Sequence, residues 1–149
     1  MQSSTPTNFL ILMFAGILAL VSIAAAFRLR PSKQSRTALL LAILPALLML
    51  VLFYSLAIHL HHHLGAWPKS IGDRGFPPLL VIHEIVAVSY CMILMLGSVV
   101  VWPIAYISCW LIRPWRAARY YLGVYALSFL VCYGAIWLAP SQFWYWWWD

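Results

Sequence analysis

The chain has 149 residues, of which 65% are hydrophobic and only 8% are charged, with a formal net charge of +6. Soluble domains carry roughly 25% charged residues, so this chain has too few to cover a water-soluble fold. The basic residues form short clusters between apolar stretches, a pattern that argues against a nucleic-acid-binding surface and favours a membrane protein. By its length we expect one integral membrane domain over residues 1–149.

Four apolar segments follow one another along the chain, at approximately 8–27, 37–64, 79–112 and 120–138. A transmembrane helix needs about 20 apolar residues, so the pattern predicts an all-α, polytopic membrane protein with about four spans in an up-down bundle. No Lys or Arg precedes the first segment, and a basic cluster follows it directly. This order is the reverse of a secretory signal, and we expect an uncleaved anchor with its N-terminus outside.

Proline and glycine residues mark the ends and bends of the later segments. Pro45 lies near the start of the second segment, where it predicts a kink, and Gly65 follows that segment as a helix stop. Residues 79–112 would extend about 51 Å as one helix, against a hydrocarbon core of about 30 Å. We therefore expect a kink at Pro103, after which the chain either continues across the membrane or lies near the interface.

The positions of the basic residues predict the orientation. Seven of the nine Lys and Arg residues lie within 28–36 and 113–119, two loops that four spans place on the same side. By the positive-inside rule both loops are cytoplasmic. The prediction is a multi-pass protein of the cell membrane, N-out and C-out, with its termini and the 65–78 loop non-cytoplasmic.

Two further sets of residues indicate helix packing and anchoring. The C-terminal residues 143–149 are almost all aromatic, which is typical of an anchor at the membrane interface or of a docking surface for another protein. Within the spans, single hydroxyl-bearing residues are expected to form interhelical hydrogen bonds: Tyr54, Ser55, Ser89, Tyr90 and Tyr125. The three cysteines occur singly in apolar segments and are expected to pack as small apolar side chains: Cys91, Cys109 and Cys132.

All five histidines lie near one predicted membrane face: His59, His61, His62, His63 and His83. His59 and His63 are four residues apart and share a helix face, and His83 should lie at the depth of His59 on the neighbouring helix. Glu84 is the only acidic residue within a predicted span.

This histidine cluster admits three chemistries. A transition metal such as zinc or copper would be held by His59, His63, His83 and Glu84. A b-type haem would take one imidazole on each side of the iron. A proton relay would use His83 and Glu84. The alternative is that the cluster binds no ligand. Histidines in the last turn of a helix are then explained by their favourable interaction with the negative end of the helix dipole.

The sequence contains no Gly-x-Ser-x-Gly pattern, no phosphate-binding glycine loop and no paired carboxylates. We therefore expect a small integral membrane protein that is a non-catalytic subunit or a binding or scaffold component of a membrane assembly, rather than an enzyme. Its partners would be the lipid bilayer and other membrane subunits or a second copy, and not nucleic acid. The alternative is a metal- or haem-binding redox protein that uses the histidine cluster at the outer face.

Overall fold

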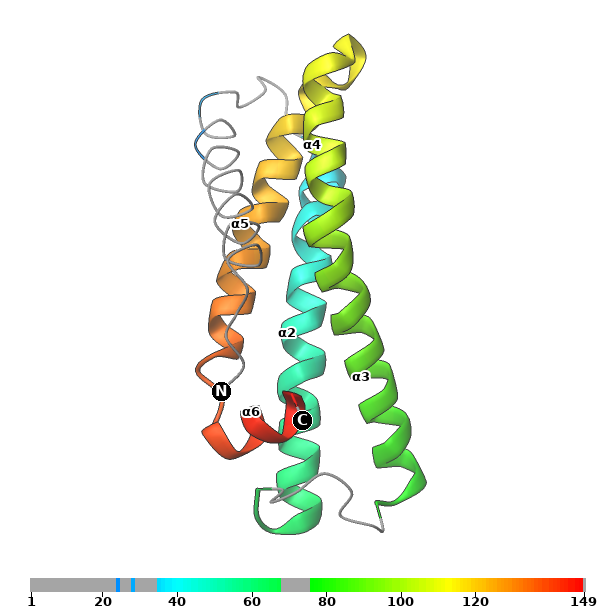
Figure 1. Ribbon diagram of the computed structural model, residues 1–149, viewed down its shortest axis with the longest axis vertical. Coiled ribbons are helices and arrows are strands. Elements are labelled where there is room, and N and C mark those ends of the chain that lie inside the picture. The colour runs from blue at the N-terminus through cyan, green and yellow to red at the C-terminus, as the bar shows by residue number, and fades with distance from the viewer. Residues whose placement is uncertain (1–23, 25–27, 29–34, 68–75, 149) are drawn as a thin grey trace, which may run out of the picture. The chain divides into compact units, whose positions relative to one another are not determined.

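The computed structural model describes residues 24, 28, 35–67 and 76–148, and in these ranges the chain is helical without any strand. The elements in chain order are α2 (Arg36–Leu64), α3 (Pro78–Leu96), a π-helix (Gly97–Val101), α4 (Trp102–Leu111), a 3-10 helix (Arg113–Ala117), α5 (Ala118–Ile136) and α6 (Ser141–Trp148), as Figure 1 shows. The predicted all-α class is confirmed for this part of the chain. The expected first span, 8–27, lies almost entirely outside the described residues.

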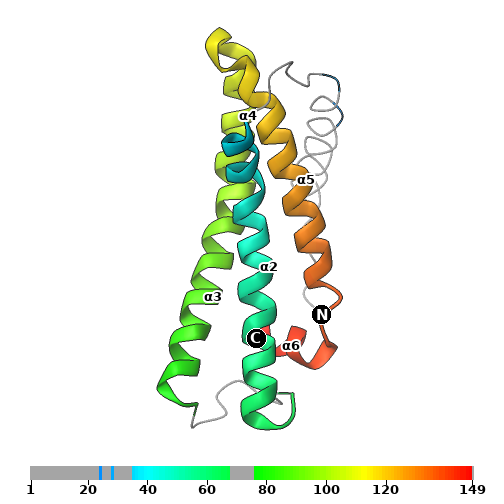
Figure 2. The same cartoon turned by 180° about the vertical axis from the view of Figure 1, so that it is seen from behind.

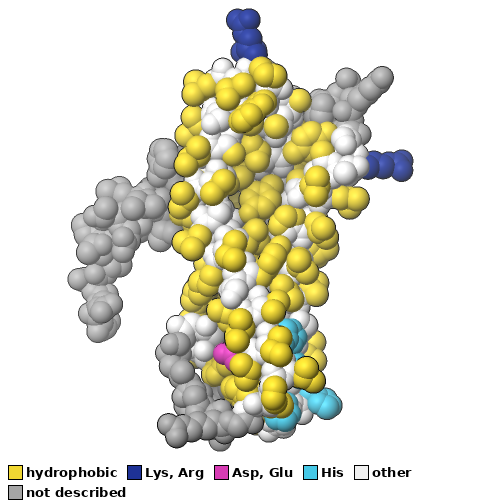
Figure 3. Space-filling view, turned by 90° about the vertical axis from the view of Figure 1, so that its right-hand side faces the viewer, with side chains coloured by type: hydrophobic (Ala, Val, Ile, Leu, Met, Phe, Trp, Pro, Cys, Tyr) yellow, Lys and Arg dark blue, Asp and Glu magenta, His cyan; other side chains and the backbone are white. Residues whose placement is uncertain are grey.

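Three helices of the described ranges are long and apolar enough to cross a membrane: Arg36–Leu64, Pro78–Leu111 and Arg113–Ile136. Large hydrophobic side chains such as Val51, Ile93 and Val131 are more than half exposed on these helices. Figure 3 shows one face of the molecule, on which hydrophobic side chains predominate. Water-soluble monomers rarely expose large contiguous apolar patches, so lipid is the solvent that this surface fits.

The third apolar segment changes its helical hydrogen bonding close to Pro103. Within Gly97–Val101 the turns are π-helical, and the backbone N–H of Trp102 donates to the carbonyl of Gly97. A proline ring collides with the carbonyl four residues before it in a regular α-helix. The wider π-turn relieves this crowding, so the sequence signal at Pro103 coincides with an interruption of the α-helix in the preceding turn.

The chain divides into two compact units, and each has its own core. The described residues of the first unit fall within Met1–Leu44 and Met95–Ser128. Its core contains Trp102 and Tyr106, whose rings are stacked with centroids 5.3 Å apart. The indole Nε1–H of Trp102 donates to the carbonyl of Leu122 over 3.0 Å, which ties α4 to α5.

Polar contacts in the first unit include one that the sequence predicted. The hydroxyl groups of Ser98 and Tyr125 lie 2.6 Å apart and join the π-helix to α5. In the predicted cytoplasmic loop, the guanidinium carbon of Arg119 lies 4.3 Å from the ring centroid of Trp110. This cation–π contact holds one of the clustered arginines against the end of α4.

The second unit consists of Pro45–Leu94 and Phe129–Asp149. Its core begins with one face of α2, where buried residues recur at intervals of three or four positions, as expected for a helix with one packed face. These residues are Ala46, Met49, Phe53, Leu56, Ala57 and Leu60. They pack against residues of α3, α5 and α6, namely Leu80, Ala87, Cys91, Cys132, Ile136 and Phe143. All three cysteines are buried and unpaired, as predicted.

Two tyrosines of the second unit form the interhelical hydrogen bonds that the sequence predicted. The Tyr54 hydroxyl donates to the carbonyl of Ala135 over 2.7 Å and joins α2 to α5. The Tyr90 hydroxyl donates to the carbonyl of Pro45 over 3.0 Å and joins α3 to α2. In lipid, where water cannot satisfy them, such groups hydrogen-bond across helices.

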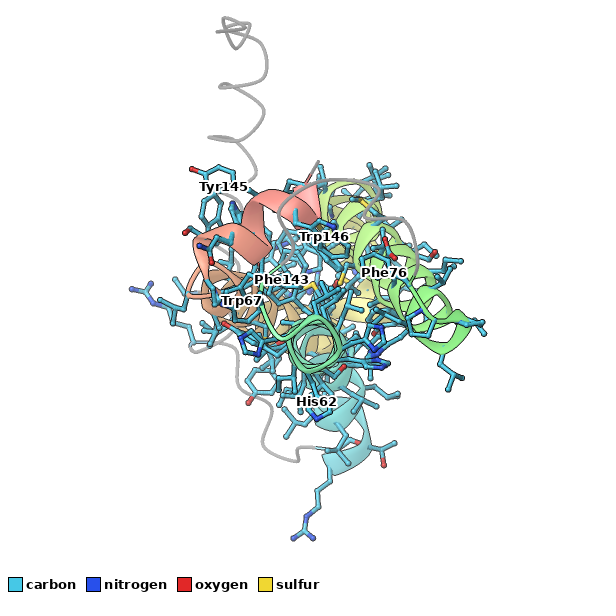
Figure 4. The ribbon with its side chains drawn as sticks, turned by 90° about the horizontal axis from the view of Figure 1, so that it is seen from below. His62, Trp67, Phe76, Phe143, Tyr145 and Trp146 are labelled. Carbon is cyan, nitrogen blue, oxygen red and sulfur yellow. The ribbon has the colours of Figure 1, made fainter. Side chains whose placement is uncertain are left out.

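The aromatic C-terminal segment forms α6, which runs across α2 rather than along it (Figures 1 and 2). Phe143 is fully buried, and its ring lies 5.0 Å from that of Phe53 and 6.1 Å from that of Trp67. Trp146 contacts Phe76 with ring centroids 6.4 Å apart. Figure 4 shows Trp67, Phe76, Phe143 and Trp146 gathered together, with Tyr145 pointing away. Thus α6 packs against the chain on both sides of residues 68–75.

Candidate histidine site

The last turn of α2 presents three histidines because the helix ends sharply at Gly65. Gly65 has a φ of 65°, and its N–H donates to the carbonyl of His61 over 3.0 Å. This is the left-handed cap that glycine favours after a helix, as the sequence predicted. His61, His62 and His63 in the preceding turn are all exposed.

The imidazoles of His59 on α2 and His83 on α3 are in direct contact. Their Nδ1 atoms lie 3.1 Å apart, and their ring centroids are separated by 5.4 Å. Both side chains are half-buried. The prediction that these two residues lie at the same depth on neighbouring helices is therefore confirmed.

Ser55 completes a chain of hydrogen bonds behind the two histidines. Its Oγ lies 3.0 Å from Nε2 of His83, and its hydroxyl also donates to the carbonyl of Leu52 over 3.0 Å. The sequence predicted that Ser55 bonds to another helix but did not connect it with the histidines. The available signal was its spacing, because Ser55 and His59 are four residues apart and share a helix face.

These contacts assign the protons of the neutral rings. The single hydroxyl proton of Ser55 goes to Leu52, so Oγ accepts from Nε2–H of His83. The Nδ1 of His83 is then an acceptor, and Nδ1–H of His59 donates to it. In this arrangement both nitrogens of His83 are used within the network, whereas Nε2 of His59 keeps its lone pair.

The other predicted ligands lie around this pair without joining it. His63 is exposed on the last turn of α2. Glu84 is half-buried on α3, but it follows His83 directly, so its side chain leaves the helix about 100° away from that of His83. Among the described residues, no group of three or more His, Cys, Asp or Glu side chains could hold a metal ion. The site formed by His59, His63, His83 and Glu84 stays a prediction, as do its transition metal and the b-type haem.

All five histidines belong to the second unit. In the face drawn in Figure 3, histidine side chains gather at one end of the second unit. Nitrogen donors are therefore concentrated where α2 ends and α3 begins, next to α6.

No protein-family model matches the chain, and neither a curated protein nor a solved structure is significantly similar to it. The functional argument therefore depends on the chemistry of its own residues.

Proposed function

We propose that this protein is a four-span integral membrane protein of the cell membrane that acts as a non-catalytic binding or scaffold subunit of a membrane assembly. Its termini and the 65–78 loop lie on the non-cytoplasmic side. The observation that carries the proposed role is an apolar helix face at the end of α5 that is largely exposed in the described part of the chain.

This α5 face consists of residues at helical spacing in the last turns of α5 and in the turn that follows it: Leu130, Val131 and Gly134 of α5, and Trp137 and Leu138 after its end. The four large side chains are between 41% and 82% exposed. A Cβ atom placed on Gly134 would meet no described atom within 4 Å. In the described part of the chain, the face is thus an apolar strip with exposed backbone at its centre.

Lipid alone does not explain a glycine at the centre of such a strip, because glycine lowers helix stability relative to alanine by about 1 kcal/mol. In membranes, small residues allow two helix backbones to approach closely, so van der Waals packing can drive association. The large residues on either side of Gly134 would then pack around the incoming helix. The face therefore fits an incoming transmembrane helix, which this proposal assigns to another subunit.

The test is association in a mild detergent. We expect wild-type protein to co-purify with a partner subunit, and Gly134→Leu to abolish this while the protein still inserts into the membrane. Gly97→Leu is the matched control, because a Cβ on Gly97 also meets no described atom within 4 Å and Gly97 lies on a different helical segment. A wild-type protein that runs as a clean monomer, or a Gly134→Leu variant that keeps its partner, contradicts the proposal. A partner that proves to be a second copy would make the assembly a homo-oligomer.

The orientation is tested by labelling Ser70→Cys with an impermeant maleimide on intact cells. The native cysteines are buried, which keeps the background low. Labelling from outside supports a non-cytoplasmic 65–78 loop, and labelling only after permeabilisation reverses the topology.

A second candidate function is metal or redox chemistry at the histidine end of the second unit. The observation that favours it is the contact of 3.1 Å between the Nδ1 atoms of His59 and His83. Because both nitrogens of His83 are hydrogen-bonded, the geometry favours a metal ion at His59 over a haem held between the two rings. The first measurement is metal analysis with a visible spectrum on protein purified without a histidine tag. A stoichiometric metal supports this candidate, a Soret band supports the haem alternative, and a colourless, metal-free sample that also fails to take up added metal counts against both.

A further inference from the structure

We propose that a divalent transition-metal ion binds at the end of α2 through Nε2 of His59 and the imidazole of His63, with His83 and Ser55 as positioning residues that do not touch the metal. This inference rests on the second candidate function and assigns different roles to the residues of that site.

The role of His59 follows from its hydrogen bond. Histidines that bind metals almost always donate their other ring N–H to an acceptor, which fixes the tautomer and the orientation of the ring. His59 has this arrangement, since its Nδ1–H donates to His83, which in turn donates to Ser55. Nε2 of His59 is thus deprotonated and oriented before any metal arrives. Because the nitrogens of His83 are both used, His83 is an orienting partner rather than a ligand.

The second ligand is selected by the geometry of α2. At about 100° per residue, His63 lies about 40° around the helix from His59 and one turn further along, whereas His62 is turned about 60° to the other side. Figure 4 shows His62 on the side of α2 that faces away from α3 and α6. His61 lies on the opposite side from His59, where its ring contacts Trp67 with centroids 4.5 Å apart. Of the three terminal histidines, His63 is turned least from the direction of His59.

The chemical class of the ion follows from the donors. Two histidines at positions i and i+4 form one face of a helical metal site, with side chains about 5–6 Å apart at Cβ. Imidazole nitrogen suits zinc, copper and nickel rather than magnesium or calcium. His63 is exposed, so the remaining coordination positions are open to water or to a group from a partner.

The experiment counts the imidazoles bound to Cu²⁺. Protein without a histidine tag, in lipid nanodiscs, is titrated with Cu²⁺, and pulsed electron paramagnetic resonance reports the number of coordinated imidazoles. We expect two in the wild type and at most one in His59→Ala and in His63→Ala. The matched control is the double variant His61→Ala/His62→Ala, which should still bind Cu²⁺ through two imidazoles.

The positioning role of His83 has its own readout. Removing an outer-shell partner typically lowers metal affinity about 10–100-fold, so we expect this loss in His83→Ala with the count still at two. His83→Asn supplies an amide oxygen that can accept from Nδ1–H of His59 and should recover affinity. Three imidazoles in the wild type and two in His83→Asn would overturn the role of His83 while leaving metal binding intact. A wild-type protein that binds no Cu²⁺ above the level of His59→Ala/His63→Ala would refute both the inference and the metal function.

Discussion

Truncating Phe143 tests whether α6 is a packed part of the second unit or only an anchor lying in the membrane interface. The Phe143 side chain is fully buried and contacts the rings of Phe53 on α2 and Trp67 after it. Replacing a buried phenylalanine by alanine typically costs about 3–5 kcal/mol. The two ring pairs alone, at about 0.5–1.5 kcal/mol each, contribute about 1–3 kcal/mol of this. Lipid and detergent chains are as apolar as the lost ring, so we expect the low end of the range, about 3 kcal/mol, for Phe143→Ala.

The assay is reversible unfolding in mixed micelles, followed by tryptophan fluorescence, with the free energy of unfolding compared between variants. Tyr145→Ala is the matched control, because Tyr145 lies on the same helix and is 72% exposed. Substitutions at such sites usually change stability by no more than about 0.5 kcal/mol. If Phe143→Ala and Tyr145→Ala were equally stable, the packing of α6 onto α2 would not contribute to folding and the argument would be wrong.

Substitutions at three further positions have expected outcomes in the same unfolding assay. Gly65→Ala should lower the free energy of unfolding by about 1–2 kcal/mol, because alanine disfavours the left-handed φ of 65°, whereas crowding is not the obstacle. Gly65→Asn should lower it less, and equal losses in the two variants would contradict this cause. Trp102→Phe should cost about 1 kcal/mol by removing the hydrogen bond to Leu122, and an unchanged stability would count against that bond. Tyr106→Phe should leave stability unchanged or raise it by up to about 1 kcal/mol, since its buried hydroxyl has no hydrogen-bond partner among the described residues. A clear loss in Tyr106→Phe would reveal a partner for that hydroxyl.

The candidate site was only partly predictable. The shared helix face of His59 and His63 follows from the periodicity of one helix. The contact between His83 and His59 follows from the similar distances of these two residues from the loop between α2 and α3. The spacing of Ser55 and His59 places both on one face of α2, but the sequence does not state that this face meets α3, so the bond between Ser55 and His83 did not follow from it. Glu84 illustrates the same limit, since its neighbour His83 takes the position facing α2 and leaves the carboxylate turned aside.

Composition and periodicity determined the helical class, the length of the three apolar helices and the stop at Gly65, because these depend on local backbone energetics and on the solvent that the side chains require. The tertiary structure decided that the aromatic C-terminus folds into α6 and buries Phe143 against Phe53. It also decided that His59 contacts His83 and that His83 contacts Ser55. Among the described residues, it left the surroundings of Gly134 on α5 open. These features depend on the rotation of each helix about its axis, which is set by packing between segments far apart in the chain and leaves no signal in any single segment.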